Sequence, residues 1–214
     1  MSTDAQRHWN AIYGGTRAEE LSWFQAHDRM SMELTRLGVP DHAAQILDVG
    51  GGASTFVDDL LAEGYRRVTV LDLAPTGLAV ARERLGAAAN QVSWVEADVL
   101  SAPFEAASVD LWHDRAVFHF LTAPNQRAQY VNQVRWAVRP GGYVLVATFA
   151  SDGPPRCSGL PVARYDPEEL HRVFGAGFEL VASRREIHRT PRGVPQSFTY
   201  CLCRFDGSDK RSDG

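Results

Sequence analysis

The sequence is poor in cysteine. Of its 214 residues, Cys157, Cys201 and Cys203 are the only cysteines, and they are too few and too unevenly spaced for a disulfide framework. Cys201 and Cys203 lie two residues apart in a strand-like segment, so they share one face and can either ligate a metal or pack as free thiols. We predict free thiols and no metal site.

Lysine and long hydrophobic runs are scarce as well. Lys210 is the only lysine, the 22 basic side chains are scattered along the chain, and the net charge is −4. Such a chain has no general attraction to a phosphate backbone or an anionic membrane, so we expect neither as a partner. No run of about 18 apolar residues is present, and the first residues lack the apolar stretch of a signal peptide. We expect a cytoplasmic protein.

From Gln45 onward the sequence alternates between short apolar runs and amphipathic stretches, a pattern typical of a parallel sheet with crossover helices. The predicted strands are 45–49, 67–71, 92–95, 109–112, 143–147, 178–182 and 198–202, and the main helices are 55–62, 76–85 and 125–137. No helix-length pattern separates the last two strands, so we expect them to pair antiparallel at the sheet edge. The predicted fold is α/β: a three-layer, doubly wound, mostly parallel seven-stranded sheet with an antiparallel C-terminal edge strand.

The length suits one domain, because single hydrophobic cores usually fill chains of roughly 100 to 200 residues. We therefore predict a single domain over residues 1–205. Within it, residues 1–40 have apolar side chains at helical spacing and are expected to form an N-terminal helical cap, and residues 44–205 form the α/β core. Residues 206–214 are expected to be a disordered tail.

The most informative stretch is 46–55, an apolar strand that runs into three glycines and then into a helix. Gly50, Gly51 and Gly52 permit positive φ angles and let a ligand approach the backbone closely. Doubly wound sheets bind cofactors in this way at the carboxyl ends of their strands. The pattern predicts a nucleotide-like ligand.

Carboxylates recur at the ends of three successive strands. Asp48 stands two residues before the first glycine, where a dinucleotide would place its pyrophosphate, so it disfavours NAD(P) and favours a ligand with an ammonium or sulfonium group. Asp72 ends the second strand and can accept both hydroxyls of a ribose. Asp98 follows the third strand and can accept the exocyclic amine of adenine. Together these acids predict a positively charged nucleoside.

In this order the motifs resemble those of the class I S-adenosylmethionine-dependent methyltransferase superfamily. The likeness rests on residues 47–52, 70–73, 96–99, 109–112 and 139–143. The resemblance implies S-adenosylmethionine as cofactor, with Asp48 and the glycine turn holding its methionine part. It implies that Asp72, beside Leu73, holds the ribose. It also implies that Asp98 and Val99 hold the adenine.

Aromatic side chains in the N-terminal segment are further candidates for the cofactor site. Trp9 and Tyr13, with Trp23 and Phe24, can close over the site, because aromatic faces attract a sulfonium and exclude water. Their helical spacing makes simple core packing an equal alternative. We include Trp9 and Tyr13 among the predicted cofactor-binding residues.

Titratable side chains crowd the end of the fourth strand, and we take His113, Asp114, Arg115 and His119 as candidate catalytic residues. Methyl transfer from a sulfonium depends mainly on alignment, and a base is needed only if the acceptor must lose a proton. Asp114 can bind a cation, Arg115 can hold an anionic acceptor, and either histidine can take a proton. Alternatively, Asp114 and Arg115 pair with each other, and His119 packs in the core.

Four functions follow, in decreasing order of support. A small-molecule methyltransferase comes first, because the chain has no basic face. A protein lysine methyltransferase comes second, because residues 110–115 loosely resemble the segment after strand four in seven-stranded enzymes of that kind, without their usual lysine and glycine. An NAD(P) oxidoreductase is opposed by Asp48, and by Thr55 where a dinucleotide fingerprint requires Gly or Ala. A noncatalytic cofactor-binding module is the fourth. The acceptor atom and the oligomeric state stay open.

Overall fold

The computed structural model describes residues 3–208. The helices are α1 (Thr3–Gly15), η1 (Ala18–Glu20), α2 (Arg29–Gly38), α3 (Phe56–Glu63), α4 (Pro75–Leu85), η2 (Gly86–Gln91), η3 (Phe118–Phe120), α5 (Pro124–Ala137) and α6 (Pro167–Phe174). The strands are β1 (Gln45–Val49), β2 (Arg67–Asp72), β3 (Val92–Glu96), β4 (Val109–Arg115), β5 (Val138–Phe149), β6 (Arg156–Cys157), β7 (Leu160–Pro161), β8 (Phe178–Arg189) and β9 (Pro195–Phe205). Within the described range, no helix combines the length and apolar character that crossing a bilayer requires.

The main sheet has seven strands in the order β3-β2-β1-β4-β5-β9-β8. The first five are parallel, and β9 pairs antiparallel with both β5 and β8. The predicted fold class is confirmed. The structure adds that the antiparallel strand β9 inserts between β5 and β8, so that β8 forms the edge.

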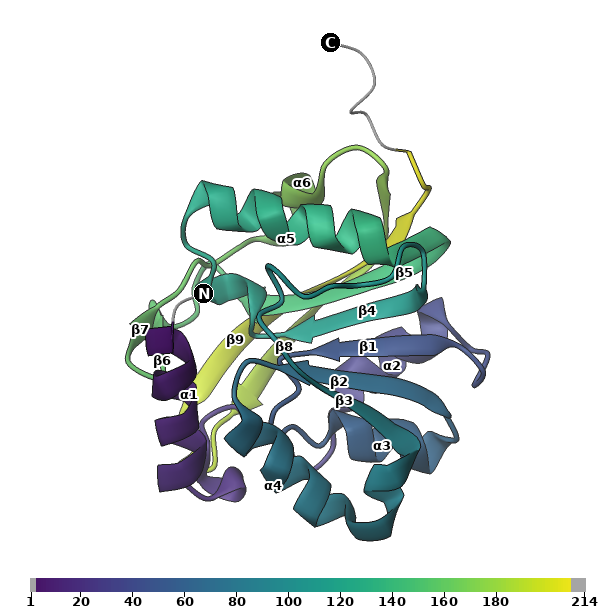
Figure 1. Ribbon diagram of the computed structural model, residues 1–214. Coiled ribbons are helices and arrows are strands. Elements are labelled where there is room, and N and C mark those ends of the chain that lie inside the picture. The colour runs from purple at the N-terminus through teal and green to yellow at the C-terminus, as the bar shows by residue number, and fades with distance from the viewer. Residues whose placement is uncertain (1–2, 209–214) are drawn as a thin grey trace.

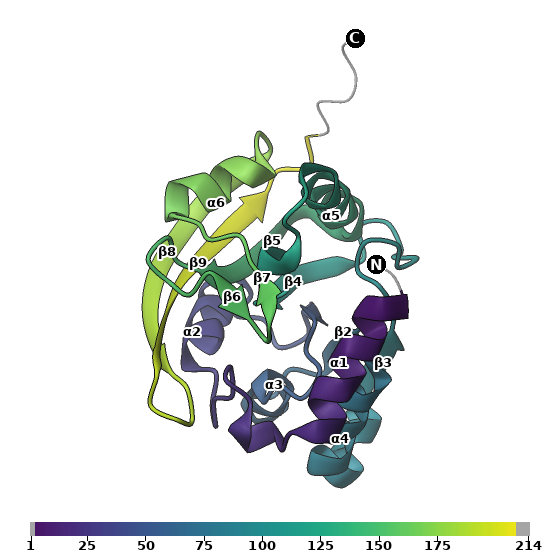
Figure 2. The same cartoon turned by 90° about the vertical axis from the view of Figure 1, so that its left-hand side faces the viewer.

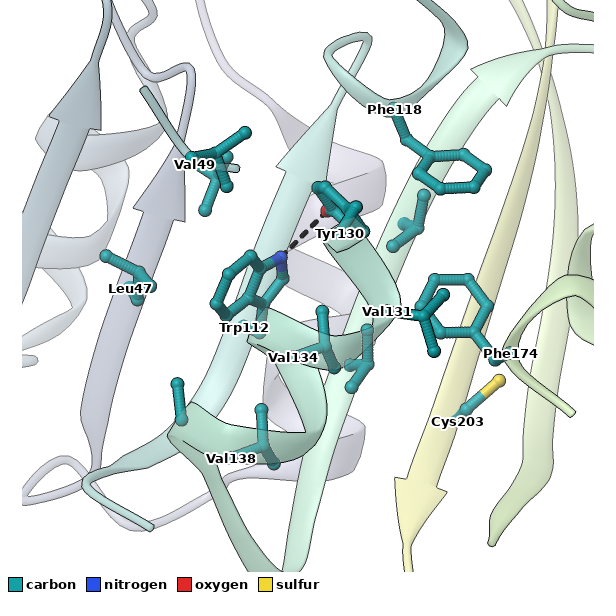
Figure 3. Packing of buried hydrophobic residues seen from close by; sticks show 14 of the residues in the cluster. Leu47, Val49, Trp112, Phe118, Tyr130, Val131, Val134, Val138, Phe174 and Cys203 are labelled. Atoms are coloured by element: carbon teal, nitrogen blue, oxygen red, sulfur yellow. Dashed lines mark hydrogen bonds between the residues drawn. The ribbon is translucent and has the colours of Figure 1, made fainter. Parts of the chain in front are cut away.

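Helices cover both faces of the sheet. Successive side chains of a strand point to opposite faces, and apolar side chains lie on both of them. Leu47, Trp112 and Val144 pack under α5 and α6, whereas Ile46 and Leu111, their neighbours in the chain, pack against α2, α3 and α4. Figure 1 shows α5 and α6 on one side of the sheet and α3 and α4 on the other. Figure 3 shows the α5 side, where Trp112 Nε1 donates to the Tyr130 hydroxyl at 2.8 Å.

The expected N-terminal cap proves to be two different structures. Met32 and Leu34 of α2 pack in the core against strand residues such as Leu145, so α2 belongs to the helical layer. Within the expected cap, it is α1, η1 and the segment up to residue 28 that lie at the end of the sheet (Figure 2). The two parts show the same helical spacing of apolar residues. This spacing predicts that a helix has a buried face, but it does not predict which part of the protein covers that face.

Two other segments differ from the sequence prediction. The Pro140-Gly141-Gly142 stretch lies within β5, so this strand begins at Val138 and not at the predicted residue 143, and its pairing with β4 shifts register between Val109 and Leu111. At the C-terminus, Asp206 N donates to Gly177 O at 2.9 Å, and Ser208 O accepts from Arg135, so residues 206–208 are held against the domain. The rest of the predicted tail, 209–214, lies outside the described residues.

The carboxyl ends of the parallel strands meet at one end of the molecule. In Figure 1 the arrows of β1 and β4 point toward the side where α1 and the β6–β7 hairpin lie, and Figure 2 looks onto that end. Gln6 Nε2 of α1 donates to Leu73 O at 3.0 Å and to Glu96 at 2.8 Å, just after β2 and at the end of β3. α1 is thereby fixed across the strand ends.

Candidate active site

A cavity of about 360 Å³ lies at the carboxyl ends of the strands. Its walls come from α1, the segment 18–28, the ends of β1, β2 and β4, the residues after β3, the hairpin β6–β7 and β9. In an open α/β sheet this is the place where ligands bind, because the connections diverge there. The position agrees with the one expected from the glycine turn.

The glycine turn after β1 shapes the floor of the cavity. Gly50 and Gly52 have φ angles of 68° and 39°, which glycine adopts without strain. A side chain on Gly51 would collide with the Asp48 carboxylate, and one on Gly52 would lie 2.8 Å from Asp72 Oδ2. Gly50 and Gly51 line the cavity, whereas Gly52 makes room for the side chains of Tyr13 and Asp72.

Asp48, in the central strand β1, is held by its neighbour in the sheet. Residue 113 of β4 stands beside it in register, and His113 Nδ1 lies 2.7 Å from Asp48 Oδ1. His113 Nε2 lies 2.9 Å from Ser31 Oγ, so both ring nitrogens are engaged. Asp48 Oδ2 is buried and has no hydrogen-bond partner among residues 3–208. Burial raises the pKa of Asp48, and the hydrogen bond from His113 partly offsets this.

Asp72, at the end of β2, is the second buried carboxylate of the cavity. Its Oδ1 accepts from Ala74 N at 2.7 Å, and it forms no ion pair with an arginine in the described structure. Burial raises its pKa to about 7. Tyr13 of α1 is buried beside it, and burial together with the charges of Asp72 and Asp48 raises the Tyr13 pKa, so the phenol stays protonated.

The remaining predicted cofactor residues lie along the same wall. Asp98 is half-buried, lines the cavity and accepts from Leu100 N at 3.0 Å through Oδ1. Leu73 and Val99 also line the cavity. Trp9 lines it as well, with its ring centroid 5.1 Å from that of Phe120.

The aromatic side chains expected over the site all reach it. Trp9, Tyr13, Trp23 and Phe24 line the cavity. The ring centroids of Trp9 and Trp23 are 6.0 Å apart, and those of Tyr13 and Trp23 are 6.2 Å apart, both in edge-to-face geometry. The two alternatives of the sequence analysis are therefore both realised, because these rings pack on one another and also form a wall.

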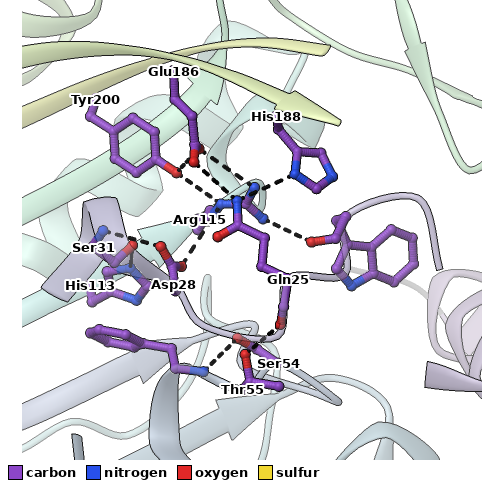
Figure 4. A network of polar contacts seen from close by, with 12 residues as sticks. Gln25, Asp28, Ser31, Ser54, Thr55, His113, Arg115, Glu186, His188 and Tyr200 are labelled. Carbon is purple, nitrogen blue, oxygen red and sulfur yellow. Dashed lines mark hydrogen bonds and ion pairs between the residues drawn. The ribbon is translucent and has the colours of Figure 1, made fainter. Parts of the chain in front are cut away.

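Arg115, at the end of β4, faces the half of the cavity over β4, β5 and β9. Its Nε donates to the Tyr200 hydroxyl at 2.9 Å, and its Nη1 donates to Trp23 O at 3.2 Å. The guanidinium carbon lies 4.5 Å from the centroid of the Phe198 ring, which is a cation–π contact. Figure 4 shows Arg115 at the centre of this polar network.

Two carboxylates compensate the charge of Arg115. Its Nε lies 3.8 Å from Asp28 Oδ2, and its Nη2 lies 3.9 Å from Glu186 Oε2. Burial lowers the pKa of Arg115, but the Tyr200 hydroxyl and these two carboxylates raise it by more. The guanidinium stays charged, and its Nη2 is buried without a hydrogen-bond partner among residues 3–208.

Asp114 does not line the cavity. Its carboxylate accepts from Val117 N at 2.8 Å, from Phe118 N at 3.1 Å and from the Tyr130 hydroxyl at 2.6 Å, with its side chain fully buried. Burial raises its pKa to about 6. Because successive side chains of a strand point to opposite faces, Asp114 turns away from the cavity that His113 and Arg115 face. We interpret it as the residue that fixes the turn after β4, and the catalytic role expected for it stays an untested prediction that these contacts do not favour.

His119 is also behind the wall of the cavity. It is fully buried, its Nδ1 accepts from Phe149 N at 3.5 Å, and its ring centroid is 4.9 Å from that of Phe149. Burial, with a smaller effect of the Arg115 charge, lowers its pKa to about 3. A base must reach the acceptor, and this histidine does not, so the second alternative, a core histidine, is the one the structure favours.

The three cysteines are buried and free. Cys157, in the hairpin β6–β7, lines the cavity, and burial raises its pKa to about 11. Cys201 and Cys203 lie in β9 on the face that packs under α6. In the part of the chain that the structure describes, no three His, Cys, Asp or Glu side chains are grouped to hold a metal ion.

Residues 46–142 match a family model described as a methyltransferase domain. These residues contain the glycine turn, the three acidic strand ends and the first half of β5. This match, over somewhat less than half of the chain, supports the resemblance to class I S-adenosylmethionine-dependent methyltransferases that the motifs carry.

Curated relatives share part of the chain. The ubiquinone/menaquinone biosynthesis C-methyltransferase UbiE of Roseobacter denitrificans is 32% identical over 135 residues, covering 58% of this chain and 53% of the relative. The O-methyltransferase cnsE of Penicillium expansum is 31% identical and covers 64% of this chain and 49% of its own length. The EEF1A lysine methyltransferase 2 of Danio rerio is 23% identical, with coverages of 74% and 65%. The chain thus spans about half the length of the first two.

Solved structures share the fold over nearly the whole chain. A protein from a study titled "Conversion of a Disulfide Bond into a Thioacetal Group during Echinomycin Biosynthesis" has a TM-score of 0.78 at 20% identity and covers 96% of this chain and 94% of its own. The 1,6-didemethyltoxoflavin-N1-methyltransferase of Burkholderia thailandensis, solved with S-adenosylhomocysteine, has a TM-score of 0.68 at 21% identity and covers 94% and 84%. At these identities the likeness establishes the fold.

Several site residues escaped the sequence analysis. Asp28 and Gln25 precede α2, Glu186 lies in β8, and Gln196 and Tyr200 lie in β9. Gln25, Asp28 and Gln196 line the cavity. Only Asp28 carried a local signal, since it is the N-cap of α2. The others come together through the order of strands β5, β9 and β8, which no short motif encodes.

Proposed function

We propose that the protein is an S-adenosylmethionine-dependent methyltransferase that acts on a small molecule. The observation that carries this proposal is the pair of buried carboxylates Asp48 and Asp72 beside a glycine turn, in one cavity, with no arginine or lysine paired to either among the described residues. Buried carboxylates without a cation are unfavourable in the ligand-free protein, so they favour a cationic ligand.

The residues present fit S-adenosylmethionine. Asp48 Oδ2, buried and without a partner, and the glycine turn suit the methionine ammonium. Asp72 suits the ribose hydroxyls, and Asp98 with Val99 suits the adenine. When bound, the cofactor supplies an electrophilic methyl group on a sulfonium.

The chain contributes alignment and exclusion of water. Trp9 and Trp23 close the cavity with aromatic faces, which attract a sulfonium. His113 is engaged at both nitrogens, and His119 lies behind the wall. Of the described histidines only His113 lines the cavity, so the reaction we propose uses no free histidine as a base and depends on positioning the acceptor in line with the methyl group.

A small-molecule acceptor is supported by the enclosure of the cavity. α1 lies across the strand ends on one side, and the hairpin β6–β7, with Cys157 and Leu160, contributes to the wall on another. The name of the C-methyltransferase relative refers to the biosynthesis of ubiquinone and menaquinone, which are small molecules. A protein acceptor is the second candidate, because a lysine methyltransferase matches 74% of this chain.

Calorimetry with S-adenosylmethionine tests the cofactor assignment. We expect micromolar binding, at least tenfold weaker in the Asp48→Asn variant, because hydrogen bonds to charged groups contribute about 1.5–3 kcal/mol. The Asp41→Asn variant, an exposed turn residue, is the matched control and should bind as the wild type does. Absence of binding at millimolar cofactor would remove the proposal.

The acceptor class is tested with cofactor labelled in its methyl group and a cell lysate. Label in the low-mass fraction supports a small-molecule acceptor. Label confined to protein bands would instead support the lysine methyltransferase alternative.

A further inference from the structure

We propose that the methyl acceptor is an amine and that Asp28 binds its nitrogen. This inference rests on the proposed function and names the acceptor class for the same cavity. It depends on three features of the half of the cavity over β4, β5 and β9: a carboxylate with an oxygen left over, a local excess of negative charge and walls of aromatic rings.

Asp28 is a buried carboxylate with one oxygen engaged. The residue is 3% exposed and lines the cavity. Its Oδ1 caps α2 by accepting from Ser31 N at 3.1 Å. Its Oδ2 accepts no hydrogen bond from the described residues, and the nearest cationic atom is Arg115 Nε at 3.8 Å, beyond hydrogen-bond distance.

Arg115 makes its hydrogen bonds to groups other than Asp28, and its Nη2 is buried without a hydrogen-bond partner among the described residues. Its guanidinium already donates to the Tyr200 hydroxyl and Trp23 O and lies over the Phe198 ring. The second carboxylate, Glu186, is satisfied separately, because it accepts from the Tyr200 hydroxyl at 2.7 Å and from Gln25 Nε2 at 3.2 Å.

The cluster around Arg115 therefore contains one guanidinium and two carboxylates, a formal charge of −1. An acceptor with a carboxylate or phosphate would meet this excess negative charge in a buried place, where charges are screened little. An amine, neutral or protonated, brings N–H donors that a carboxylate oxygen accepts strongly. The charge balance selects amines over acids.

Asp28 also lies next to the donor half of the cavity. Ser31, which Asp28 caps, has its Oγ 2.9 Å from His113, and His113 holds Asp48. Burial and His113 have larger effects on the pKa of Asp48, but the negative charge of Asp28 also raises it. The two carboxylates therefore repel each other. A nitrogen bound at Asp28 thus stands near the proposed methionine site and relieves that repulsion. Figure 4 shows Asp28 between Ser31 and Arg115.

Aromatic rings complete this half of the cavity. Trp23, Phe149 and Phe198 line it, and the ring centroids of Phe149 and Phe198 are 4.9 Å apart. Such rings pack against a planar apolar body and attract an ammonium group. The acceptor we infer is therefore an amine attached to an aromatic or otherwise flat skeleton.

The chemistry needs no base on the protein. The lone pair of the neutral amine nitrogen forms a bond to the methyl carbon while the carbon–sulfur bond breaks, and that electron pair stays on sulfur. The nitrogen becomes a methylated ammonium and then releases one N–H proton to water. Asp28 accepts a hydrogen bond from another N–H of the amine and so orients the nitrogen lone pair toward the methyl carbon. An alcohol, by contrast, would need a base to become nucleophilic, and neither His113 nor His119 is free to serve.

Binding to the protein saturated with S-adenosylhomocysteine tests the inference without turnover. The probes are matched pairs: phenethylamine against 3-phenylpropionate, and tryptamine against indole-3-propionate. We expect each amine to bind at least tenfold more tightly than its acid. Equal affinity, a preference for the acids, or no amine binding while S-adenosylhomocysteine binds would overturn the inference and leave the proposed function standing. No binding of S-adenosylhomocysteine would overturn the proposed function itself.

The variant Asp28→Asn tests whether the carboxylate of Asp28 causes the preference for amines over acids. Asparagine caps a helix as well as aspartate does, so α2 should keep its start while the negative charge is lost. We expect the amine preference to fall below threefold with the affinity for S-adenosylhomocysteine within threefold of wild type. Asp28→Ser, which also caps a helix, serves if the first variant folds poorly, and Asp41→Asn is the charge control. An unchanged amine preference in a folded Asp28 variant would contradict the assignment.

Discussion

The two halves of the cavity hold their charges in different ways. Over β1 and β2, Asp48 and Asp72 are buried carboxylates that no arginine or lysine of the described chain neutralises. Over β4 and β9, Arg115 is surrounded by two carboxylates, a phenol and an aromatic ring. The first half is built for a positive charge that comes from a ligand. In the second half the guanidinium of Arg115 balances one of the two carboxylates and leaves one negative charge in excess. The two halves should therefore respond differently when a charge is removed.

Removing the cation of the second half should have the largest effect. In Arg115→Met, Asp28 and Glu186 lose their buried partner, and breaking a buried pair costs about 3–5 kcal/mol of the free energy of unfolding. Arg184→Met is the control, because Arg184 pairs with Glu33 at the surface and such pairs contribute under about 1 kcal/mol. Urea unfolding of both variants measures the difference, and equal losses would contradict the comparison.

Asp114 should matter for stability and not for binding. In Asp114→Ala the amides of Val117 and Phe118 and the Tyr130 hydroxyl lose their acceptor, which should cost about 3 kcal/mol. The affinity for S-adenosylmethionine should stay within threefold of wild type, because Asp114 faces away from the cavity. Calorimetry at a temperature where the variant is folded checks this. A large loss of affinity with little loss of stability would restore the catalytic role first expected for it.

In the other half, removing a charge should stabilise the ligand-free protein. The pKa of Asp72 is raised from 3.8 to about 7 in the folded state, so the folded chain binds its proton more tightly than the unfolded chain. This contribution to the free energy of unfolding is present at low pH and is lost as the pH rises from about 4 to about 7. The Asp72→Asn variant has no carboxylate at this position, so its stability does not fall for this reason.

Relative to wild type, Asp72→Asn should therefore gain roughly 2 kcal/mol of stability between pH 5 and pH 8. Its affinity for S-adenosylmethionine should fall at the same time. Denaturant unfolding at both pH values, without ligand, measures the gain. A pH dependence identical to that of wild type would show that Asp72 is not the titrating group.

The smallest effect is expected at His119. His119→Gln keeps a polar group near Phe149 N and should change the stability by less than about 1 kcal/mol. With an accepted amine substrate, kcat and the pH profile should be unchanged, since this ring does not reach the cavity. A lost limb of the pH profile in the variant would identify His119 as a base after all.

The sheet and the cofactor half could largely be predicted from local sequence. The strands 45–49 and 92–95 were placed within one residue, because apolar periodicity is a local property. The antiparallel pairing of the closing strands was also predicted, but β8 runs to Arg189 and so extends well beyond the predicted 178–182. Asp48, Asp72 and Asp98 could be found because each follows an apolar run, and parallel strands bring their carboxyl ends together.

Side-chain direction at the end of β4 was harder to predict. Residues 113, 114 and 115 alternate between two faces, so two of the three enter the cavity and the middle one is buried behind it. The sequence named all three as candidates because it marks where a strand ends and not which face each residue takes.

The sequence by itself determined the α/β fold, the position of the glycine turn and the acidic strand ends, because these depend on periodicity and on residues close together in the chain. Only the tertiary structure decided which charges meet. Asp28, Arg115, Glu186 and Tyr200 come from four separate segments that the strand order β4-β5-β9-β8 and the packing of α2 bring together. The physical reason is that the charge of a buried group depends on its neighbours in space, and those are set by the packing of the whole sheet.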